Sequence, residues 1–567
     1  MALPELKELC LAPLVSSAER FLAMQWSDGR FEVTPEYETE VWNQFHQQYI
    51  LAAALLYTTE HPANPWRGSE RLWQAMLRSG RHIASHVDAN GAMLWNLNEH
   101  HMIFCDQRLL CAWLLAYEML ESQLPQEDAR LWREAILRGC DWLWAHHVFP
   151  YRETQKFTAH PDGVNTGTNH FSLYLALLHR AGRRFGRPEW VTLCTDLMHR
   201  LLAAQAPAGY WLEHEGPALG YNYLTYHGVD EYTAWSGDQA GLDALRRGLD
   251  LHRDWTYPDG VGIECIDGRM RHTGGPFVWG LSGFARWPDG RGYARLLLSH
   301  LKEDSLSGET AAKLAEAYLL LSDRAEGEET PTPQLQPRYR SVLEGSSVVR
   351  KEGPWVIALS GQCASKWEDN PFILDRQCLL SVWRQGVGLV LDGSNSKRQP
   401  ELATFHRGAG PQADHLPLSV QLLPAVGAEE AIAVEYGSFR AAVRVRLVDP
   451  RTVEVIVSAR GGEGQPVLVT LVPAVHFGES VTVYGDGGVH PRVLGEEPFS
   501  FDLREHGGVL AFGKVRLLLP GGTRVEYPIS PFNSYHARNI SPPGANRLLV
   551  TCPAGRGGVA FRVQVED

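Results

Sequence analysis

The chain has 567 residues, of which 44% are hydrophobic and 21% are charged, and its formal net charge is −13. This length exceeds what one ordinary hydrophobic core contains, so we expect two or three globular domains. The negative charge, together with the absence of a Lys/Arg-rich run, excludes nucleic acid as an expected partner.

The N-terminal stretch carries charges at Glu5, Lys7 and Glu8, where a signal peptide would have its apolar run. No later segment reaches the roughly 18 uninterrupted apolar residues that a membrane span requires. We therefore expect a soluble cytoplasmic protein without a membrane partner, or a periplasmic or secreted one if the sequence has been trimmed. The nine cysteines form no C-x-x-C pair, which predicts buried free thiols rather than disulfides or a zinc site.

Residues 1–325 have a dominant helical period, with apolar residues three or four positions apart. The clearest stretches are 14–24, 49–57, 72–83, 109–120, 131–144, 171–178 and 314–321. Together with shorter candidates they suggest about ten to twelve helices in antiparallel succession, with no strands between them. We expect an α/α toroid, incomplete or of six hairpins, and a helical solenoid is the competing architecture.

Residues 326–338 are rich in proline and glutamate, which predicts a linker. After it the apolar period changes to two, as in 442–447, 453–457 and 561–565. We therefore expect residues 339–567 to form an antiparallel β-sandwich. The predicted fold class is α+β multidomain, with the toroid first and the sandwich second.

An adjacent amide and imidazole, Asn169 and His170, follow Gly167 and Thr168 and precede an apolar helical face. We expect this pair in the first turn of a helix, with Thr168 as a candidate cap. There the outward-pointing N–H groups and the helix dipole favour an anion. Asn169 can donate to a carboxylate and His170 can accept a proton near neutral pH. The alternative is a simple helix cap beside a histidine that bonds a loop.

Three tyrosines follow Gly220 within six residues, at Tyr221, Tyr223 and Tyr226. Tyr223 and Tyr226 share a face if the segment is helical, whereas Tyr221 and Tyr223 share one if it is extended. A phenol, with a pKa of about 10, donates a proton readily but acts as a base only beside a cation or in a dry site. Core packing is the alternative role for these rings.

Other residues are candidates for substrate contact because they lie near the central stretch or in polar loops. These candidates are His101, Arg108, Arg152, Lys156, Trp211, Glu215, His227 and His406. Tryptophans beside loops, namely Trp95, Trp211 and Trp255, offer indole faces on which sugar rings stack. His227 is also a candidate second base.

The Asn169-His170 pair, the later Glu215-Gly216-Pro217 to Tyr226 segment and the helical-then-β plan together resemble the heparinase II/III-like and alginate-lyase-like polysaccharide lyases. The resemblance implies β-elimination on a uronic-acid-containing polysaccharide or oligosaccharide. It implies that Asn169 neutralises the uronate carboxylate and that His170 is a base or a carboxylate partner. It also implies that Tyr221 is the acid and base, with Tyr223 as the alternate.

Relatives often carry a His-x-His element in the first strands of the β-domain, where histidines hold a structural zinc. The comparable stretch here, 395–406, has no such pair, so we expect no metal and no cofactor. His406 and Lys397 are the residues through which this domain could still contribute to the site.

Two other functions remain open. A glycoside hydrolase on the same toroid would use paired carboxylates. Its candidates are Asp162, Glu213, Glu215, Asp230 and Glu231. A non-catalytic carbohydrate-binding protein would engage glycans with the sandwich and use the helical half as a scaffold.

Overall fold

The computed structural model describes residues 5–31, 44–97, 100–103, 105–157, 167–213, 216–272, 275–302, 306–321, 328–363, 370–461, 464–485, 487–534, 536 and 538–566. Contacts divide the chain into two compact units. Unit 1 consists of Met1–Leu212, Tyr221–Arg253 and Gly275–Thr332. Unit 2 consists of Glu213–Gly220, Asp254–Gly274 and Pro333–Asp567.

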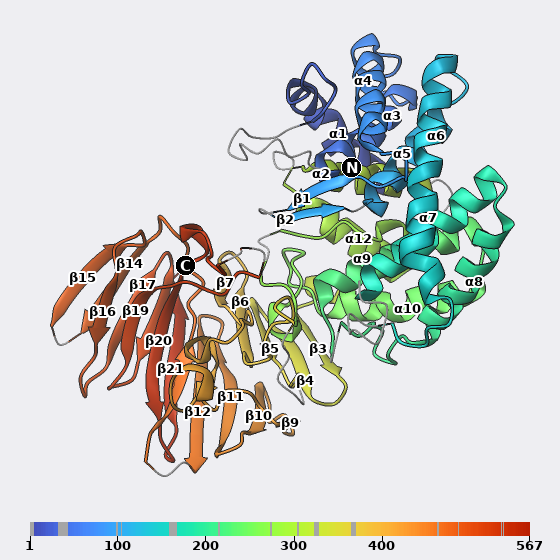
Figure 1. Cartoon of the computed structure of the whole chain (residues 1–567). Helices are drawn as coiled ribbons and strands as arrows, with labels where there is room; N and C mark the ends of the chain where they lie inside the picture. The colour runs from blue at the N-terminus through green and yellow to red at the C-terminus, as the bar shows by residue number, and fades with distance from the viewer. Residues whose placement is uncertain are drawn as a thin grey trace. The chain divides into compact units, whose positions relative to one another are not determined.

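Unit 1 is built almost entirely from helices, drawn from blue to yellow-green in Figure 1. The helices are α1 (Leu6–Ala23), α2 (Gln44–Gln47), α3 (Tyr49–Thr58), α4 (Glu70–His86), α5 (Gln107–Leu120), α6 (Gln126–Leu143), α7 (Gly167–Phe185), α8 (Pro188–Ala203), α9 (Leu219–Ser236), α10 (Gln239–Asp254), α11 (Leu281–Phe284), α12 (Pro288–Ser299) and α13 (Gly308–Leu320). Each stretch with the predicted helical period overlaps one of them, so those predictions are confirmed.

Helices α3, α5 and α7 are buried around most of their circumference, whereas α4 and α6 bury one face and expose the other. A helix that is apolar on nearly all sides lies inside a larger assembly, and an amphipathic helix covers it. This pattern gives inner and outer helices, which is the arrangement of an α/α toroid.

The inner helices α5 and α7 run in the same direction, because contacts between them advance along both helices together. Gln107 contacts His170 near the two helix starts, and Arg180 pairs with Glu118 further along. Helix α9 runs parallel to α7 by the same criterion. Thr225 Oγ1 is 3.5 Å from Thr168 Oγ1 near the helix starts, and the rings of His179 and Tyr232 lie 5.1 Å apart further along.

Helix α13 joins this parallel set through α5. Arg108 Nη1 donates to Glu309 Oε1 over 3.0 Å at the start of both helices. Cys111 and Glu316 offer ligand atoms within 4.8 Å of one another a turn or two later. The inner helices α5, α7, α9 and α13 therefore begin at one common end of unit 1.

Helices α7 and α9 approach each other closely at Gly228. A Cβ built on this glycine would lie 2.5 Å from Ser172 Oγ and 2.9 Å from the Leu173 amide nitrogen. Only a residue without a side chain fits there, so Gly228 sets the spacing between the two helices.

A two-stranded antiparallel hairpin interrupts the helices of unit 1, with β1 at Leu94–Leu97 and β2 at His100–Ile103. The expectation of no strands in this half is wrong at this one place. The segment between Val87 and Cys105 is too short for a further helical hairpin, and pairing satisfies its backbone polar groups instead.

Unit 2 contains three antiparallel sheets. One sheet has nine strands in the order β15-β14-β17-β18-β21-β12-β11-β10-β9, and two have five, in the orders β16-β19-β20-β13-β8 and β3-β4-β5-β6-β7. The strands are β3 (Arg338–Leu343), β4 (Ser347–Glu352), β5 (Trp355–Leu359), β6 (Leu380–Arg384), β7 (Gly388–Leu391), β8 (Phe405–His406), β9 (Ser419–Leu422), β10 (Glu429–Glu435), β11 (Phe439–Asp449), β12 (Thr452–Gly461), β13 (Val467–Leu471), β14 (Ser480–Gly485), β15 (Gly488–Val493), β16 (Phe499–Asp502), β17 (Gly508–Phe512), β18 (Val515–Leu519), β19 (Arg524–Ile529), β20 (Arg547–Ala554) and β21 (Val559–Val565).

Alternation along the strands explains how these sheets pack. In β11 the side chains of Val443 and Val445 are buried, while Arg444 and Arg446 are exposed. Buried residues of all three sheets belong to one hydrophobic cluster, which forms the core of the predicted sandwich. The period-two stretches lie in β11, β12 and β21, so the strand predictions are confirmed.

Strand β5 is buried along its whole length, because the sheet that contains it is covered on both faces. The covering segment is Asp254–Gly274, which the sequence places among the helices. The Tyr257 ring stacks on Trp383 of β6 at 6.1 Å, and Glu264 accepts a hydrogen bond of 2.6 Å from Ser381. These contacts explain why the segment belongs to unit 2.

All nine cysteines are unbridged, and all except the half-buried Cys363 are buried, which confirms the prediction of buried thiols. Among the described residues, no helix combines the length and apolar character needed to cross a membrane.

Candidate functional site

The polar residues of the candidate site lie where the inner helices of unit 1 begin. Asp106 caps α5 by accepting hydrogen bonds from the amides of Arg108 and Leu109. Asn169 and His170 lie in the first turn of α7, which begins at Gly167, so the predicted placement of this pair is confirmed. Thr168 lies inside the helix rather than capping it.

Asn169 has a buried side chain with unusual hydrogen bonding. Its side chain is 1% exposed, and neither Oδ1 nor Nδ2 has a partner among the described residues. Leaving a buried polar group unpaired costs about 1–3 kcal/mol. Such a group calls for an explanation, and contact with a bound ligand is one of them.

His170 lies next to Asn169 but is only half-buried. Its Nδ1 is 2.9 Å from Nε2 of Gln107, the first residue of α5. The imidazole also approaches Tyr174, one turn later on α7, at a ring distance of 6.3 Å. His170 is thus held between two inner helices.

A row of bonded charged side chains lies beside His170. Arg108 donates to Asp106 Oδ2 over 2.7 Å and to Glu309 Oε1 over 3.0 Å. Burial alone would raise the pKa of Asp106, but Arg108, the Leu109 amide and His170 together hold it below its usual value. Arg108 is therefore already engaged by two carboxylates, although we predicted it as a substrate contact.

Tyr174 and His147 are site neighbours that the sequence reasoning missed. The Tyr174 ring stacks on His147 at 5.0 Å, and its hydroxyl has no partner among the described residues. Burial raises the pKa of Tyr174 well above its ordinary value, so the phenol stays protonated. Burial, then His146, lowers the pKa of His147 to about 4. The sequence could have pointed to Tyr174, because residues four positions apart on a helix, such as His170 and Tyr174, lie on the same face.

The tyrosine segment is helical, because Leu219–Ser236 forms α9. Of the three rings, Tyr221 is half-buried, whereas Tyr223 and Tyr226 belong to the core. Tyr223 is 1% exposed, its hydroxyl bonds that of Tyr293, and its ring stacks on His252 at 3.9 Å. These contacts favour Tyr221 over Tyr223 as the reactive phenol.

Tyr221 lies at the same end of unit 1 as Asn169. Thr225 Oγ1 is 3.5 Å from Thr168 Oγ1 and 3.4 Å from the carbonyl oxygen of Tyr221. Because α7 and α9 are parallel, Tyr221, one turn before Thr225, lies about one helical turn before the level of Thr168. The structure therefore brings the predicted amide, imidazole and phenol to neighbouring helix starts.

The other predicted contacts of unit 1 divide by exposure. Arg152 and Lys156 are exposed, and the Arg152 guanidinium donates to the Phe149 carbonyl over 3.0 Å. Trp211 is buried, and its indole nitrogen donates to the Leu201 carbonyl over 2.8 Å. Trp211 thus fills the core, as does the buried Trp255 of unit 2.

His227 is 2% exposed and belongs to a buried ionic cluster. Its Nε2 is 2.9 Å from Glu316 Oε2 and 3.1 Å from the Lys313 ammonium, and Lys313 is 2.7 Å from Glu316. The Gly280 amide donates to Nδ1 over 3.3 Å. We predicted His227 as a substrate contact, but these partners occupy both ring nitrogens.

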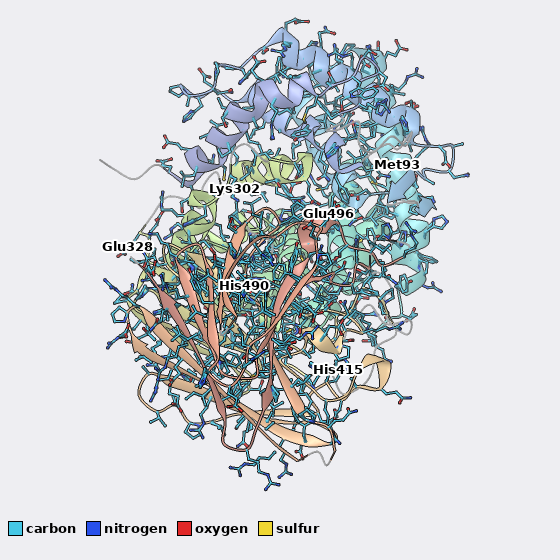
Figure 2. The ribbon with its side chains drawn as sticks, turned by 90° about the vertical axis from the view of Figure 1, so that its left-hand side faces the viewer. Met93, Lys302, Glu328, His415, His490 and Glu496 are labelled. Carbon is cyan, nitrogen blue, oxygen red and sulfur yellow. The ribbon has the colours of Figure 1, made fainter. Side chains whose placement is uncertain are left out.

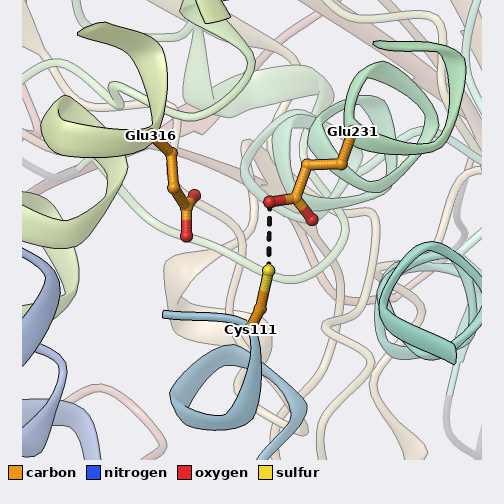
Figure 3. Close-up of side chains that lie close together, drawn as sticks. All are labelled: Cys111, Glu231 and Glu316. Atoms are coloured by element: carbon orange, nitrogen blue, oxygen red, sulfur yellow. Dashed lines mark hydrogen bonds between the residues drawn. The ribbon is translucent and has the colours of Figure 1, made fainter. Parts of the chain in front are cut away.

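The same cluster brings together three possible metal-ligand side chains among the described residues. Figure 3 shows Cys111, Glu231 and Glu316 converging from α5, α9 and α13, with Cys111 Sγ donating to Glu231 Oε1 over 3.2 Å. Their ligand atoms lie within 4.8 Å of one another. The Lys313 ammonium already supplies a positive charge there, so the donor set does not require a metal ion.

The carboxylates suggested for a hydrolase are buried and engaged wherever they are described. Glu213 pairs with Arg269, and Asp230 pairs with Arg286 over 2.8 Å. Burial, then Glu316, raises the pKa of Glu231. Asp162 and Glu215 lie outside the described residues.

The remaining predicted residues are His101 and His406. The backbone of His101 pairs with Asn96 between β1 and β2, and its side chain lies outside the described part. His406 is a buried residue of β8 in unit 2, where burial, then His415, lowers its pKa to about 4. Lys397 is buried 3.4 Å from Asp375. Figure 2 labels His415 among the loops and strands of this unit.

No family model and no curated protein matches the sequence. Among solved structures, the chain is similar to the chondroitin AC lyase of Streptomyces coelicolor A3 in complex with chondroitin sulphate, with 12% identity, 98% of this chain and 79% of that chain covered, and a TM-score of 0.50. It is also similar to a heparinase III, with 12% identity, coverages of 98% and 83%, and a TM-score of 0.48. A mutant of the heparan sulfate lyase of Pedobacter heparinus gives 10% identity, coverages of 100% and 84%, and a TM-score of 0.46. The chain therefore has the fold of this chondroitin AC lyase, an α/α toroid followed in the sequence by an antiparallel β-sandwich, and the predicted fold class is confirmed.

Proposed function

We propose that the protein cleaves a uronic-acid-containing polysaccharide or oligosaccharide by β-elimination at the helix starts of unit 1. The observation that carries this proposal is the buried amide of Asn169, which has no partner among the described residues and lies beside His170. The chondroitin AC lyase with the same fold was solved with an acidic polysaccharide, which supports a substrate of this class.

The electrostatics of this end favour an acidic sugar despite the net charge of −13. The dipoles of parallel helices add, and each places about half a positive charge at its first turn. A cluster of such first turns can bind an anion even in a negatively charged protein.

Elimination needs the carboxylate to be stabilised while the neighbouring carbon loses its proton. Abstraction builds a second negative charge on the carboxylate group, so donors arranged beforehand around its oxygens lower the barrier. In this proposal the Asn169 amide supplies one donor and His170 binds the carboxylate or takes the proton. Tyr221 transfers the proton to the departing oxygen, since it is the half-buried phenol of its segment.

The burial of the candidate carboxylates that the structure describes favours elimination over hydrolysis. A retaining or inverting hydrolase needs two carboxyl groups that face the substrate. Glu213, Asp230 and Glu231 are buried and bonded to partners within the protein.

Turnover on a panel of uronate glycans tests this function, with chondroitin sulfate, heparan sulfate and alginate as members. We expect ultraviolet absorbance from the conjugated enoate to grow without added cofactor, and Tyr221→Phe to abolish it. Tyr223→Phe is the matched control and should retain most of the rate. A flat trace with every glycan, or new reducing ends without absorbance, would contradict the proposal.

A further inference from the structure

The contact between Gln107 and His170 bears on which ring nitrogen of His170 carries the proton. Gln107 is 1% exposed, and its Nε2 lies 2.9 Å from Nδ1 of His170. In the orientation that this amide has, its nitrogen donates and Nδ1 of His170 accepts, while Gln107 Oε1 has no partner among the described residues. A neutral imidazole carries a single ring proton, which is then on Nε2.

We propose that Gln107 is a positioning residue that keeps the neutral His170 ring in its Nε2–H tautomer. This inference deepens the proposed function and rests on it, because it specifies what His170 presents to an acidic sugar. In the Nε2–H form His170 is a hydrogen-bond donor, like Asn169. Both then bind the carboxylate. Tyr221, as a phenolate, takes the proton from the carbon beside the carboxylate and returns it to the departing oxygen.

The backbone at Gln107 is held firmly enough for this role. Asp106, which precedes it, accepts from the Arg108 and Leu109 amides over 2.8 and 3.1 Å. The Asp106 amide in turn donates to Gln44 Oε1 over 3.0 Å. The first turn of α5 is thereby fixed, and Gln107 reaches across to α7 from a rigid start.

Asp106, the carboxylate near His170, does not replace Gln107 as the partner of His170 Nδ1. Asp106 acts on His170 electrostatically, but its oxygens already accept from Arg108 and from two backbone amides. Glu309 of α13 faces Arg108 rather than the imidazole, and Tyr174 of α7 stays protonated. A carboxylate facing Nδ1 would hold the opposite tautomer, so an amide at Gln107 is a chemically distinct choice.

Nitrogen NMR of the full chain with ¹⁵N-labelled histidine tests the inference, with His170 assigned by its loss in His170→Ala. We expect His170 in the wild type to show an unprotonated Nδ1 and a protonated Nε2 when neutral. In Gln107→Glu the carboxylate can only accept, so the ring proton should move to Nδ1. The same variant should raise the pKa of His170 by about one unit or more, because a carboxylate then faces the ring.

A second variant and a matched control keep the result interpretable. Gln107→Met keeps the side-chain length without a hydrogen bond, so it should give a mixture of tautomers. Gln47→Glu makes the same chemical change in a buried glutamine that bonds the backbone of Phe31, and it should leave the His170 signals unchanged.

Two outcomes would overturn the inference. One is a wild-type His170 with its proton on Nδ1. The other is a tautomer that stays the same in both Gln107 variants, which would leave Gln107 a packing residue that affects only the melting temperature. These readouts need no turnover, so a protein that is inactive on every glycan would count against the proposed function and not against this tautomer.

Discussion

At Asn169 the structure keeps a buried amide whose two polar atoms have no partner among the described residues. Sequence reasoning placed this residue correctly in a first helical turn, because glycines and an apolar periodicity mark the start of α7. It predicted Arg108, Trp211 and His227 as substrate contacts, although their side chains are bonded within the protein. The partners of Arg108 and His227 come from the distant helix α13, which a linear pattern cannot show.

Replacing Asn169 by alanine should separate activity from stability. Loss of a donor placed for a developing charge typically costs about 10²–10³-fold in rate. The melting temperature should stay the same or rise slightly, because the amide has no hydrogen bond to lose within the part of the chain that the structure describes. Enoate formation and thermal unfolding of the variant measure the two effects.

Asn64→Ala is the matched control. Asn64 is also buried, but it donates to the Leu56 and Thr59 carbonyls over 2.7 and 2.8 Å. Its loss should lower the melting temperature and leave the rate unchanged. An Asn169→Ala variant with full activity would remove the main support for the proposed function.

Lys313→Met should destabilise unit 1 by about 3–5 kcal/mol at neutral pH, because it leaves buried carboxylates without their cation. Burial would raise the pKa of Glu316, but Lys313 and His227 hold it below its usual value. Without the Lys313 ammonium, the pKa of Glu316 in the folded variant should exceed its value in the unfolded chain. Protonation of Glu316 should therefore stabilise the folded variant. The stability deficit should then be largest at high pH and shrink as pH falls.

Urea unfolding at pH 7.5 and pH 5 measures this deficit. The double variant Lys313→Met/Glu316→Leu replaces the ion pair by apolar groups and should recover much of the lost stability. A deficit that grows toward acid pH would contradict the assigned charges.

At the scale of elements, period and composition predicted most of the structure. Helical periods located α1, α3, α4, α5, α6, α7 and α13, and alternation located β11, β12 and β21, whereas α8, α10 and α12 were not individually predicted. The conformation of the tyrosine segment was undecided, since both periods place two rings on one face, and packing inside unit 1 makes it α9. The β1–β2 hairpin was missed because its pairing is local and short.

Gly228→Ala tests the crossing of α7 and α9. In an ordinary helix interior this change would stabilise the protein by about 1 kcal/mol. Here the new Cβ would lie 2.5 Å from Ser172 Oγ, so overpacking should give a net loss of about 1–3 kcal/mol. Chemical denaturation measures it, and Gly544→Ala, where a Cβ meets nothing within 4 Å, should have little effect. A stabilised Gly228→Ala would show that the two helices are not in contact there.

At the scale of the whole molecule, the two compact units do not correspond to the two continuous stretches of the sequence that composition had indicated. Boundaries at residues 325 and 339 stay a prediction, while contacts assign Glu213–Gly220 and Asp254–Gly274 to unit 2. Nothing in the local pattern of these segments reveals this, because their partners lie more than a hundred residues away. One such partner pair is Asp259 and the Trp383 indole nitrogen, 2.7 Å apart.

A fragment starting at Pro333 should therefore fold poorly by itself. It lacks the segment that covers β6, so Trp383 and Ser381 lose their partners. We expect weak near-ultraviolet circular dichroism and binding of a hydrophobic dye. A fusion that adds residues 254–274 through a long Gly/Ser linker should restore a cooperative transition. Equal behaviour of the two fragments would show that the covering segment is dispensable.

The buried thiols give this protein built-in reporters of how it opens. Burial keeps them from reacting in the native state, because a thiolate forms with difficulty in an apolar environment. Five of them, Cys10, Cys105, Cys111, Cys140 and Cys194, report on unit 1, and three, Cys265, Cys378 and Cys552, report on unit 2. Timed alkylation followed by peptide mass spectrometry would therefore reveal which half loosens first, without any engineered label.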